Sequence, residues 1–189
     1  MKTLMQRLAP GATDMIRADH ARVLTVFHRY HLDSRPAARK ALAETICLAL
    51  EVHARMEEEV FYPAMREAGS TLVDKFVPEH EEMRSLIAQL RGLDPASELF
   101  DATFMELMRA VIHHVADEET AMLPHAESVL APRLKEIGAQ MAKRRLQLAA
   151  PHAGAMVRRS ATASPVNAMM AAAALIAGVV LFRRARRTD

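Results

Sequence analysis

Apolar positions recur every three or four residues along most of the chain, which is the spacing of amphipathic helices. Proline in a first turn and short glycine- or proline-containing breaks separate four such stretches. Short connections between long helices favour antiparallel neighbours, so we predict an all-α fold built as an up-down-up-down four-helix bundle. The stretches are residues 14–31, Pro36 to just before Gly69, Ser70 or Thr71 to Gly92, and from after Pro95 to at least Met122.

Composition agrees with this pattern. The chain of 189 residues has only 6 glycines and no tryptophan, which favours helices over sheets, and its length suits one domain with an appendage. The single cysteine, Cys47, excludes an internal disulfide framework and a zinc site of the CxxC type.

The chain divides by composition into six parts. A body is followed by a basic helix, a linker rich in Ala, Pro, Ser and Thr, an apolar segment and a basic end. The predicted parts are an N-terminal lead (1–13), the bundle (14–130), the basic helix (131–149), the linker (150–165), the apolar segment (166–182) and the basic tail (183–189).

Charge is distributed unevenly. Up to Pro132 the sequence has 14 Lys and Arg against 21 Asp and Glu, a net charge of −7, whereas from Arg133 onward it has 11 against 2, a net charge of +9. A basic tail on an acidic body can meet nucleic acid or anionic lipid. The neighbouring apolar segment favours lipid, so we expect no nucleic-acid partner.

The apolar segment Val166–Phe182 has only Asn167 as a polar residue. As a helix its 17 residues would be about 25 Å long, near the lower limit for crossing a bilayer. Either it is a C-terminal hydrophobic helix that anchors the protein in a membrane, with the following arginines at the headgroups, or it docks on its own domain or a partner. Because the N-terminus has no apolar run of secretory length, we expect the anchored domain to face the cytoplasm.

Histidines and carboxylates interrupt the apolar stripes, and they do so in a repeated order. The segment HARMEEEVFYP (53–63) aligns with HVADEETAMLP (114–124) at a separation of 61 residues, and the pairs Asp19-His20 and Glu79-His80 lie 60 residues apart. Each half of the body therefore has a histidine on one helix and an HxxxE motif on the next. The matched motif residues are His53 with His114 and Glu57 with Glu118.

The HxxxE spacing places both side chains on one helix face, one turn apart. Burying a carboxylate without a partner is costly, and the four stripes contain no Lys or Arg that could pair with it. A single buried histidine is more often a hydrogen-bonded core residue than a ligand. Four histidines on four stripes, together with two carboxylates, instead indicate a bound metal.

Imidazole and carboxylate ligands without thiolate suit iron, manganese or zinc. Six protein ligands are too many for a tetrahedral zinc site but suit two metals bridged by carboxylates. If Glu57 and Glu118 bridge, each metal receives two histidine nitrogens and two carboxylate oxygens. An oxo or hydroxo bridge would leave one position per metal for O2, NO or peroxide.

Four segments carry a family resemblance. DHARVLTVF, HARMEEEVFYP, EHEEM and HHVADEETAMLP resemble the signature segments of the hemerythrin-like, or HHE cation-binding, family over roughly residues 14–130. The resemblance implies a four-helix bundle around a non-haem di-iron centre, in a family whose members bind O2, sense O2, iron or NO, or help repair iron centres. The implied metal ligands are His20, His53, Glu57, His80, His114 and Glu118.

The pattern departs from that of oxygen-carrying hemerythrins. Their third helix has a motif resembling HxxxH, and their fourth helix has one resembling HxxxxD. Here Arg84 stands four residues after His80, so a fifth histidine ligand is missing. The symmetric set resembles members associated with iron and nitrosative stress. His113 is the alternative to His114 as a ligand, while Glu58 and Glu119 are expected in solvent or around the ligands and Tyr62 in the core or near the site.

The leading hypothesis is therefore a membrane-tethered di-iron protein that binds or senses O2, NO or iron, a sensor or carrier rather than an enzyme. One alternative is a di-iron enzyme that decomposes peroxide or oxidises ferrous iron. Another is a metal-free helical membrane adaptor.

Overall fold

The computed structural model describes residues 10–152. Within this range the regular structure is helical, without a β-strand, which confirms the all-α prediction. The chain divides into two units, Met1–Leu146 and Gln147–Asp189. The predicted apolar segment Val166–Phe182 and the basic tail lie outside the described residues, as does most of the predicted linker. Among residues 10–152, no helix is both long and apolar enough to cross a membrane.

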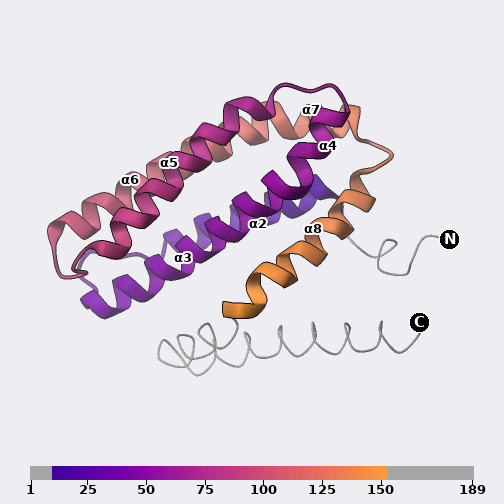
Figure 1. The fold of residues 1–189 in the computed structure, drawn as a ribbon. Helices are drawn as coiled ribbons and strands as arrows, with labels where there is room; N and C mark the ends of the chain where they lie inside the picture. Colours follow the sequence, from indigo (N-terminus) through magenta and orange to yellow (C-terminus); the bar gives the residue numbers. More distant parts are fainter. Residues whose placement is uncertain (1–9, 153–189) are drawn as a thin grey trace, which may run out of the picture. The chain divides into compact units, whose positions relative to one another are not determined.

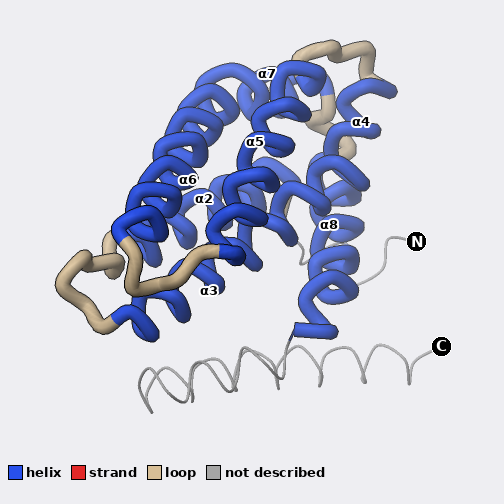
Figure 2. Tube along the Cα trace, turned by 60° about the vertical axis from the view of Figure 1, so that its left-hand side comes forward, coloured by secondary structure: helices blue, strands red, loops and turns tan. Residues whose placement is uncertain are grey.

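Four long helices form the body of the first unit. Consecutive helices run in opposite directions, α2 beside α3 and α5 beside α6 (Figures 1 and 2). These helices are α2 (Ala12–Phe27), α3 (Pro36–Met56), α5 (Val73–Gly92) and α6 (Glu98–Asp117). Further elements come after α3 and after α6, namely α4 (Tyr62–Glu67), α7 (Leu123–Val129), α8 (Leu134–Ala149) and a 3-10 turn, Ala150–His152.

The interior consists of two apolar clusters. Along the helices, a layer of buried polar side chains lies between the residues of one cluster and those of the other. On α2, Ile16 belongs to one cluster and Val23 to the other, with His20 between them. On α5, Phe76 belongs to the first cluster and Met83 to the second, with the buried His80 between them. α2, α3 and α5 thus contribute to both clusters, on either side of a histidine, whereas α6 contributes to the second cluster and α7 after it to the first. The apolar clusters bury the polar layer.

The second predicted helix contains one wide turn that the periodicity did not indicate. A π-helical turn, η1, spans Glu57–Phe61, where the Tyr62 N–H bonds to the Glu57 carbonyl five residues earlier. Pro63 follows at once. Because proline has no N–H and its ring crowds the carbonyl four residues before it, the regular α pattern cannot continue through this position.

The fourth predicted helix has the same interruption in η2 (Glu118–Met122), again followed by a proline, Pro124. The expectation of uninterrupted helices at these two places was wrong. The wide turns matter for the interior. In an α-helix, residues five apart point about 140° away from each other, whereas here both Glu57 and Tyr62 are fully buried.

The first helix is shorter than predicted and ends at Phe27 instead of near His31. Beyond it, the Tyr30 ring stacks on Phe104 of α6 at 4.1 Å between centroids, and its hydroxyl donates to Asp101. Arg39 of α3 pairs with the same carboxylate. These contacts hold the chain against α6 in a turn. The third helix begins at Val73 rather than at Ser70 or Thr71, after Gly69 ends α4 with a positive φ of 83°.

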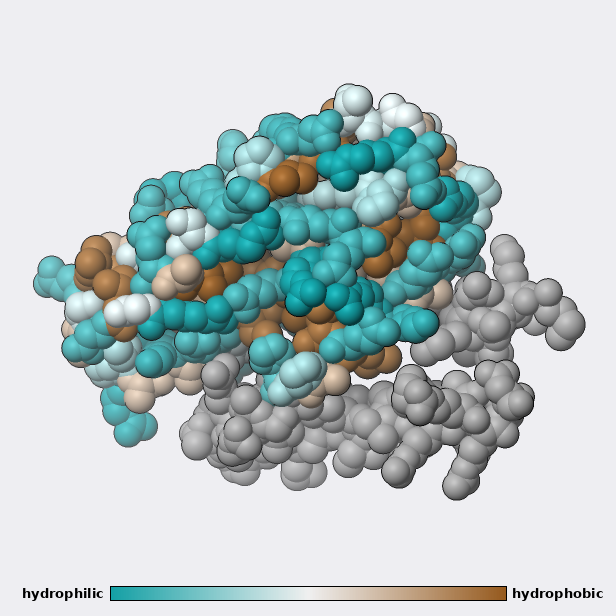
Figure 3. Space-filling view, viewed as in Figure 1, coloured by the Kyte–Doolittle hydropathy of each residue, from teal (hydrophilic) through white to brown (hydrophobic). Residues whose placement is uncertain are grey.

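A fifth substantial helix, α8, overlaps the predicted basic helix 131–149. Its Ile137 and Met141 are buried in the same apolar cluster as Met56 and Phe61. The visible face of the described residues is mostly hydrophilic, with small separate apolar areas (Figure 3). Leu32 and Leu99 are the most exposed of the large apolar side chains.

Candidate metal centre

The structure brings the six predicted ligands together in the polar layer. Each comes from a different place on the four long helices or the two π turns, and each residue is at most 4% exposed. Two groups have ligand atoms that all lie within 4.8 Å of one another, and the two groups share His114. These groups are His20, His53, His114 and Glu118, and Glu57, His80 and His114.

Each glutamate faces two imidazoles that belong to different helices. For Glu57, Oε1 lies 3.3 Å from His53 Nε2 and Oε2 lies 3.4 Å from His80 Nε2. For Glu118, Oε2 lies 3.1 Å from His20 Nε2 and 3.6 Å from His114 Nε2. Each carboxylate therefore lies between two histidines of different helices and could hold a metal together with them.

Within residues 10–152, most of the inward atoms lack hydrogen-bond partners, and only Glu57 Oε2 and His80 Nε2 lie within reach of a donor, the Tyr62 hydroxyl. Buried atoms without a partner among the described residues include Nε2 of His20, His53 and His114, Oε1 of Glu57 and both carboxylate oxygens of Glu118. Leaving one such buried polar atom unpaired costs roughly 1–3 kcal/mol. Imidazole nitrogens and carboxylate oxygens at this spacing are the donors that transition metals prefer, so the residues present fit a metal.

Comparison with known proteins agrees with this geometry. Residues 11–126 match the family model described as the hemerythrin HHE cation-binding domain. The chain belongs to the hemerythrin HHE family. It is therefore a cation-binding-domain protein with a His/Glu cluster able to hold metal.

Two known proteins are similar to parts of this chain. A protein named DNA nickase from Nostoc sp. (strain PCC 7120) is 30% identical over 110 residues, which are 58% of this chain and 31% of that protein. The chain thus spans about a third of the curated relative. A solved hemerythrin HHE domain-containing protein, the Rv2633c homolog from Mycobacterium kansasii, has 20% identity and a TM-score of 0.65, covering 86% of this chain and 99% of that one. This structure supports the hemerythrin-like fold.

Four carboxylates form a ring around the candidate metal centre, and each faces the Nδ1 atom of one histidine, the imidazole nitrogen that points away from the centre. Three of them approach the Nδ1 atoms at hydrogen-bond distance: Glu119 to His20 at 2.9 Å, Glu58 to His80 at 2.9 Å, and Glu79 to His114 at 2.8 Å. The fourth, Asp19, lies 3.6 Å from His53 Nδ1. A carboxylate that accepts a hydrogen bond from Nδ1–H leaves the lone pair of Nε2 for a metal and fixes the ring orientation.

Sequence reasoning only partly found this ring. Glu58 and Glu119 were expected in solvent or around the ligands, and the structure places both against histidines. Asp19 and Glu79 were noticed only as the acids that precede His20 and His80 in the repeat. Their repetition was the available signal, but the helix to which each side chain crosses was not readable from the order of residues.

Arg84 has a different role from the missing fifth histidine. Its guanidinium donates to Glu58 Oε1 at 3.0 Å, the same oxygen that faces His80 Nδ1. Although burial opposes ionisation of Glu58, its contacts with His80 and Arg84 lower the pKa of its carboxyl group. Arg84 thus stabilises an outer carboxylate instead of offering an imidazole to the centre.

Burial and mutual charge divide the pKa values of the inner groups. Burial lowers the pKa of His20 and His80, but the neighbouring carboxylates outweigh it and raise both values to about 9. Burial and the three other imidazoles lower the pKa of His114 to about 3. Despite burial, the imidazoles of His53 and His80 lower the pKa of Glu57 to about 2, whereas burial and the charge of Glu57 raise that of Glu118.

Tyr62 makes the two halves of the centre unequal. Its hydroxyl lies 3.5 Å from both Glu57 Oε2 and His80 Nε2, and its ring stacks on His80. Burial, reinforced by nearby carboxylates, raises the pKa of this phenol, so it remains a hydrogen-bond donor. In the repeat, the corresponding position is Leu123. Tyr62 therefore serves both the core and the edge of the site.

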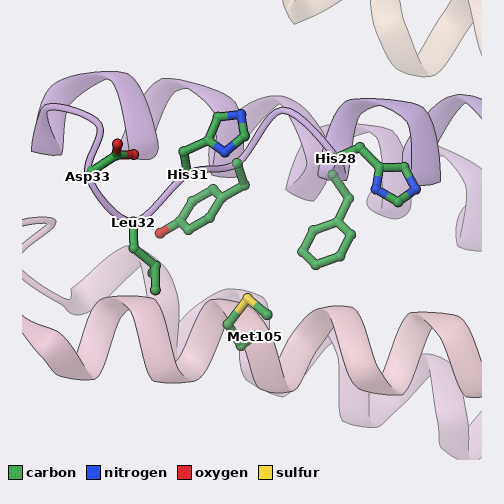
Figure 4. Close-up of a pocket in the computed structure, with 7 residues that line it drawn as sticks. His28, His31, Leu32, Asp33 and Met105 are labelled. Atoms are coloured by element: carbon green, nitrogen blue, oxygen red, sulfur yellow. The ribbon is translucent and has the colours of Figure 1, made fainter.

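The other candidate histidines lie elsewhere. The side chain of His113 is 77% exposed, so it does not replace His114. His28 and His31 line an open pocket after α2, of about 510 Å³, which contains none of the six candidate ligands. In that pocket Leu32 and Met105 point toward each other, whereas His28, His31 and Asp33 do not converge (Figure 4).

Cys47 is buried, and burial raises the pKa of its thiol to about 12.

Proposed function

We propose that this chain is a non-haem di-iron protein that binds or senses O2, NO or iron, tethered to a membrane by its C-terminal apolar segment. The observation that carries the proposal is the set of inward nitrogen and oxygen atoms without hydrogen-bond partners, contributed by three histidines and two glutamates, in a cluster that His80 completes. Such a set is costly without cations and is compensated by them.

The donor arrangement supports two ions in preference to one. Glu57 faces His53 and His80, whereas Glu118 faces His20 and His114. A redox-active metal pair with open coordination positions would supply the chemistry for binding O2, NO or peroxide. The chain itself orients the imidazoles through the outer carboxylates and excludes bulk water with the two apolar clusters.

The replacement of a fifth histidine by Arg84 favours sensing over simple reversible carriage. In this protein the residue stabilises Glu58, so fewer protein ligands are available to saturate the metals. Open positions leave room for small exogenous ligands, including NO.

Iron content tests the proposal directly. The full-length protein, purified in detergent and loaded with ferrous iron without air, is expected to bind about two ions per chain and, after exposure to air, to absorb in the near ultraviolet as oxo-bridged iron does. Fewer than about one and a half irons per chain, with no such absorption, would contradict it. Addition of NO or O2 should then change the spectrum.

A second candidate is a di-iron enzyme that decomposes peroxide or oxidises ferrous iron. The Tyr62 hydroxyl, 3.5 Å from two candidate ligands, favours it because a buried hydrogen-bond donor beside the site can deliver or hold a proton. Catalytic consumption of peroxide by the iron-loaded protein, lost in Tyr62→Phe with iron content unchanged, would support this function. A binder or sensor would not turn over.

The metal-free adaptor makes the opposite prediction for the same side chains. If no cation binds, removing the unpaired carboxylate of Glu118 should stabilise the protein under every condition, because an uncompensated buried group is lost. If metals bind, the loaded protein should lose stability by the same change.

A further inference from the structure

Helix α8 lies beyond residues 11–126, the part that matches the HHE family model, yet it packs against the metal-binding region. Its buried Ile137 and Met141 join the apolar cluster that contains Phe61 and Met122 of the two π turns. Gly138 permits a close approach to the start of α2, since a Cβ at this position would lie 2.2 Å from the Pro10 carbonyl oxygen. The position of α8 along the bundle is therefore closely fixed.

Arg145 extends from α8 to the carboxylate ring. Its Nη2 donates a hydrogen bond to Asp19 Oδ2 and lies 3.8 Å from Met56 Sδ. The same Oδ2 atom lies 3.6 Å from His53 Nδ1. The other oxygen, Oδ1, accepts a hydrogen bond from Arg22 at 2.9 Å. Arg145 and Arg22 together hold both oxygens of Asp19, and Asp19 in turn faces a candidate ligand.

His53 differs from the other three histidines in how it is supported. Their outer nitrogens meet glutamates at 2.8–2.9 Å, whereas the shorter Asp19 stands farther from His53. In the internal repeat Asp19 corresponds to Glu79, which has one more methylene and reaches His114 directly. At this distance His53 Nδ1 has no hydrogen-bond partner among the described residues, so the place at which Arg145 and Arg22 hold the shorter aspartate decides whether it can meet the His53 ring.

Burial strengthens the ion pair between Arg145 and Asp19. The Asp19 side chain is 11% exposed and that of Arg145 is 27% exposed. An aspartate buried to this extent needs a compensating cation, and a bidentate or fixed guanidinium also restricts its orientation. Arg22 cannot fix it alone, because its own side chain is 63% exposed and exposed ion pairs are weak.

We propose that Arg145 is a positioning residue of the metal centre, which acts through Asp19 to orient the His53 imidazole, so that α8 is a working part of the site. This inference rests on the proposed metal-binding function. It assigns to the region after the family domain a role in holding metal, and it connects the basic helix to one half of the centre.

The test compares two adjacent arginines in the full-length protein. Arg145→Gln removes the contact with Asp19. Arg144→Gln is the matched control, since the Arg144 guanidinium bonds to Glu59, which is not among the carboxylates that face a histidine. Each variant is loaded with Fe²⁺ without air, and metal release to a chromogenic chelator is followed. Parallel zinc-loaded, ¹⁵N-histidine-labelled samples report the ring signals of His53.

Arg145→Gln is expected to release one of the two metals roughly 10- to 100-fold faster than the unchanged protein, the range found when a group that orients a metal ligand is lost. The His53 ring signals should shift, while Arg144→Gln behaves like the unchanged protein in both measurements. Asp19→Asn should reproduce the defect, and the double variant should be no worse than either single one because both act through one contact. Arg145→Lys should restore part of the retention.

Equal metal release and unchanged His53 signals in Arg145→Gln and Arg144→Gln would overturn the inference. If Arg145→Gln does not fold, Asp19→Asn and Arg145→Lys decide the matter by the same two measurements. Failure of the unchanged protein to load two metals would instead count against the proposed function. The two failures are therefore distinguishable.

Discussion

At the scale of single residues, the histidines and glutamates of the candidate centre shift one another's pKa values. In the metal-free protein, His20 and His80 have pKa values raised to about 9 by carboxylates that outweigh burial, while Glu57 has a pKa lowered to about 2. Near neutral pH these imidazoles hold protons beside ionised carboxylate. The protons occupy the nitrogen lone pairs that a metal would use, so metal and protons compete for the same atoms.

This competition predicts a pH dependence for metal binding. Because the pKa values of His20 and His80 lie above neutrality, metal uptake at pH 7 should release protons, and apparent affinity should rise as pH increases toward about 9. Calorimetric titration in two buffers of different ionisation enthalpy measures the protons released. Uptake with no proton release and constant affinity between pH 7 and 9 would contradict the assignment.

The same shifts affect the stability of the metal-free protein. A histidine whose folded-state pKa is raised stabilises the fold fully below its unfolded pKa and loses that contribution as pH rises through the folded value. The contribution of His20 and His80 should therefore be present below about pH 6.5 and lost near pH 9. Chemical denaturation across this range, with and without metal, checks it, since metal should remove the dependence.

The buried glutamates allow a sharper substitution. Glu57→Gln keeps the shape but removes the negative charge, so we expect metal content to fall from about two ions per chain to one or fewer. The melting temperature of the loaded protein should fall by more than that of the metal-free protein, which loses only the pairing of Glu57 with the His53 and His80 imidazoles. Glu59→Gln is the control, because Glu59 pairs with Arg55 and Arg144 on the outside. Metal content that is equal in the two variants would argue against Glu57 as a ligand.

At the scale of elements, each π turn buries a candidate ligand together with core side chains. The turns Glu57–Phe61 and Glu118–Met122 recur in both halves, each before a proline. Periodicity predicted the helices around them correctly, since apolar spacing reports the buried face. It could not predict the turns, because a single inserted residue shifts the pattern by less than the scatter of real sequences. The repeated proline six residues after each glutamate was the usable signal.

Replacing Pro63 tests the link between the turn and the site. Alanine would restore an N–H and relieve the crowding, so the helix could return to α geometry and turn Glu57 and Tyr62 apart. We expect Pro63→Ala to leave the metal-free protein as stable or more stable and to reduce metal content. Pro36→Ala, at the first turn of α3, is the control for loss of a proline as such. Unchanged metal content in Pro63→Ala would show that the wide turn is dispensable.

At the scale of the whole molecule, the HHE domain is placed in a longer chain with a basic, apolar end. Because the four long helices alternate in direction, the two copies of the repeated motif, about 60 residues apart in sequence, meet in one polar layer. Helix α8 then adds Arg145 from beyond that domain. The apolar segment Val166–Phe182 lies outside the described residues, so membrane attachment remains a prediction from the sequence.

Truncation separates attachment from metal binding. Deleting residues 166–189 should move the protein from the membrane fraction to the soluble fraction of lysed cells, since the apolar segment and its arginines are removed. Metal content should stay at the full-length value, because the six candidate ligands and Arg145 are retained. A truncated protein that remains with the membrane would contradict the anchor.

The sequence by itself determined the helical class, the six candidate ligands and the twofold order of the motifs. It could do so because helical periodicity and the cost of buried charge act on residues near one another in the chain. Only the tertiary structure decided which carboxylate faces which histidine: Glu119 crosses to His20 and Glu79 to His114. Those pairings depend on how the helices are rotated and packed against each other, and residue order does not specify that rotation.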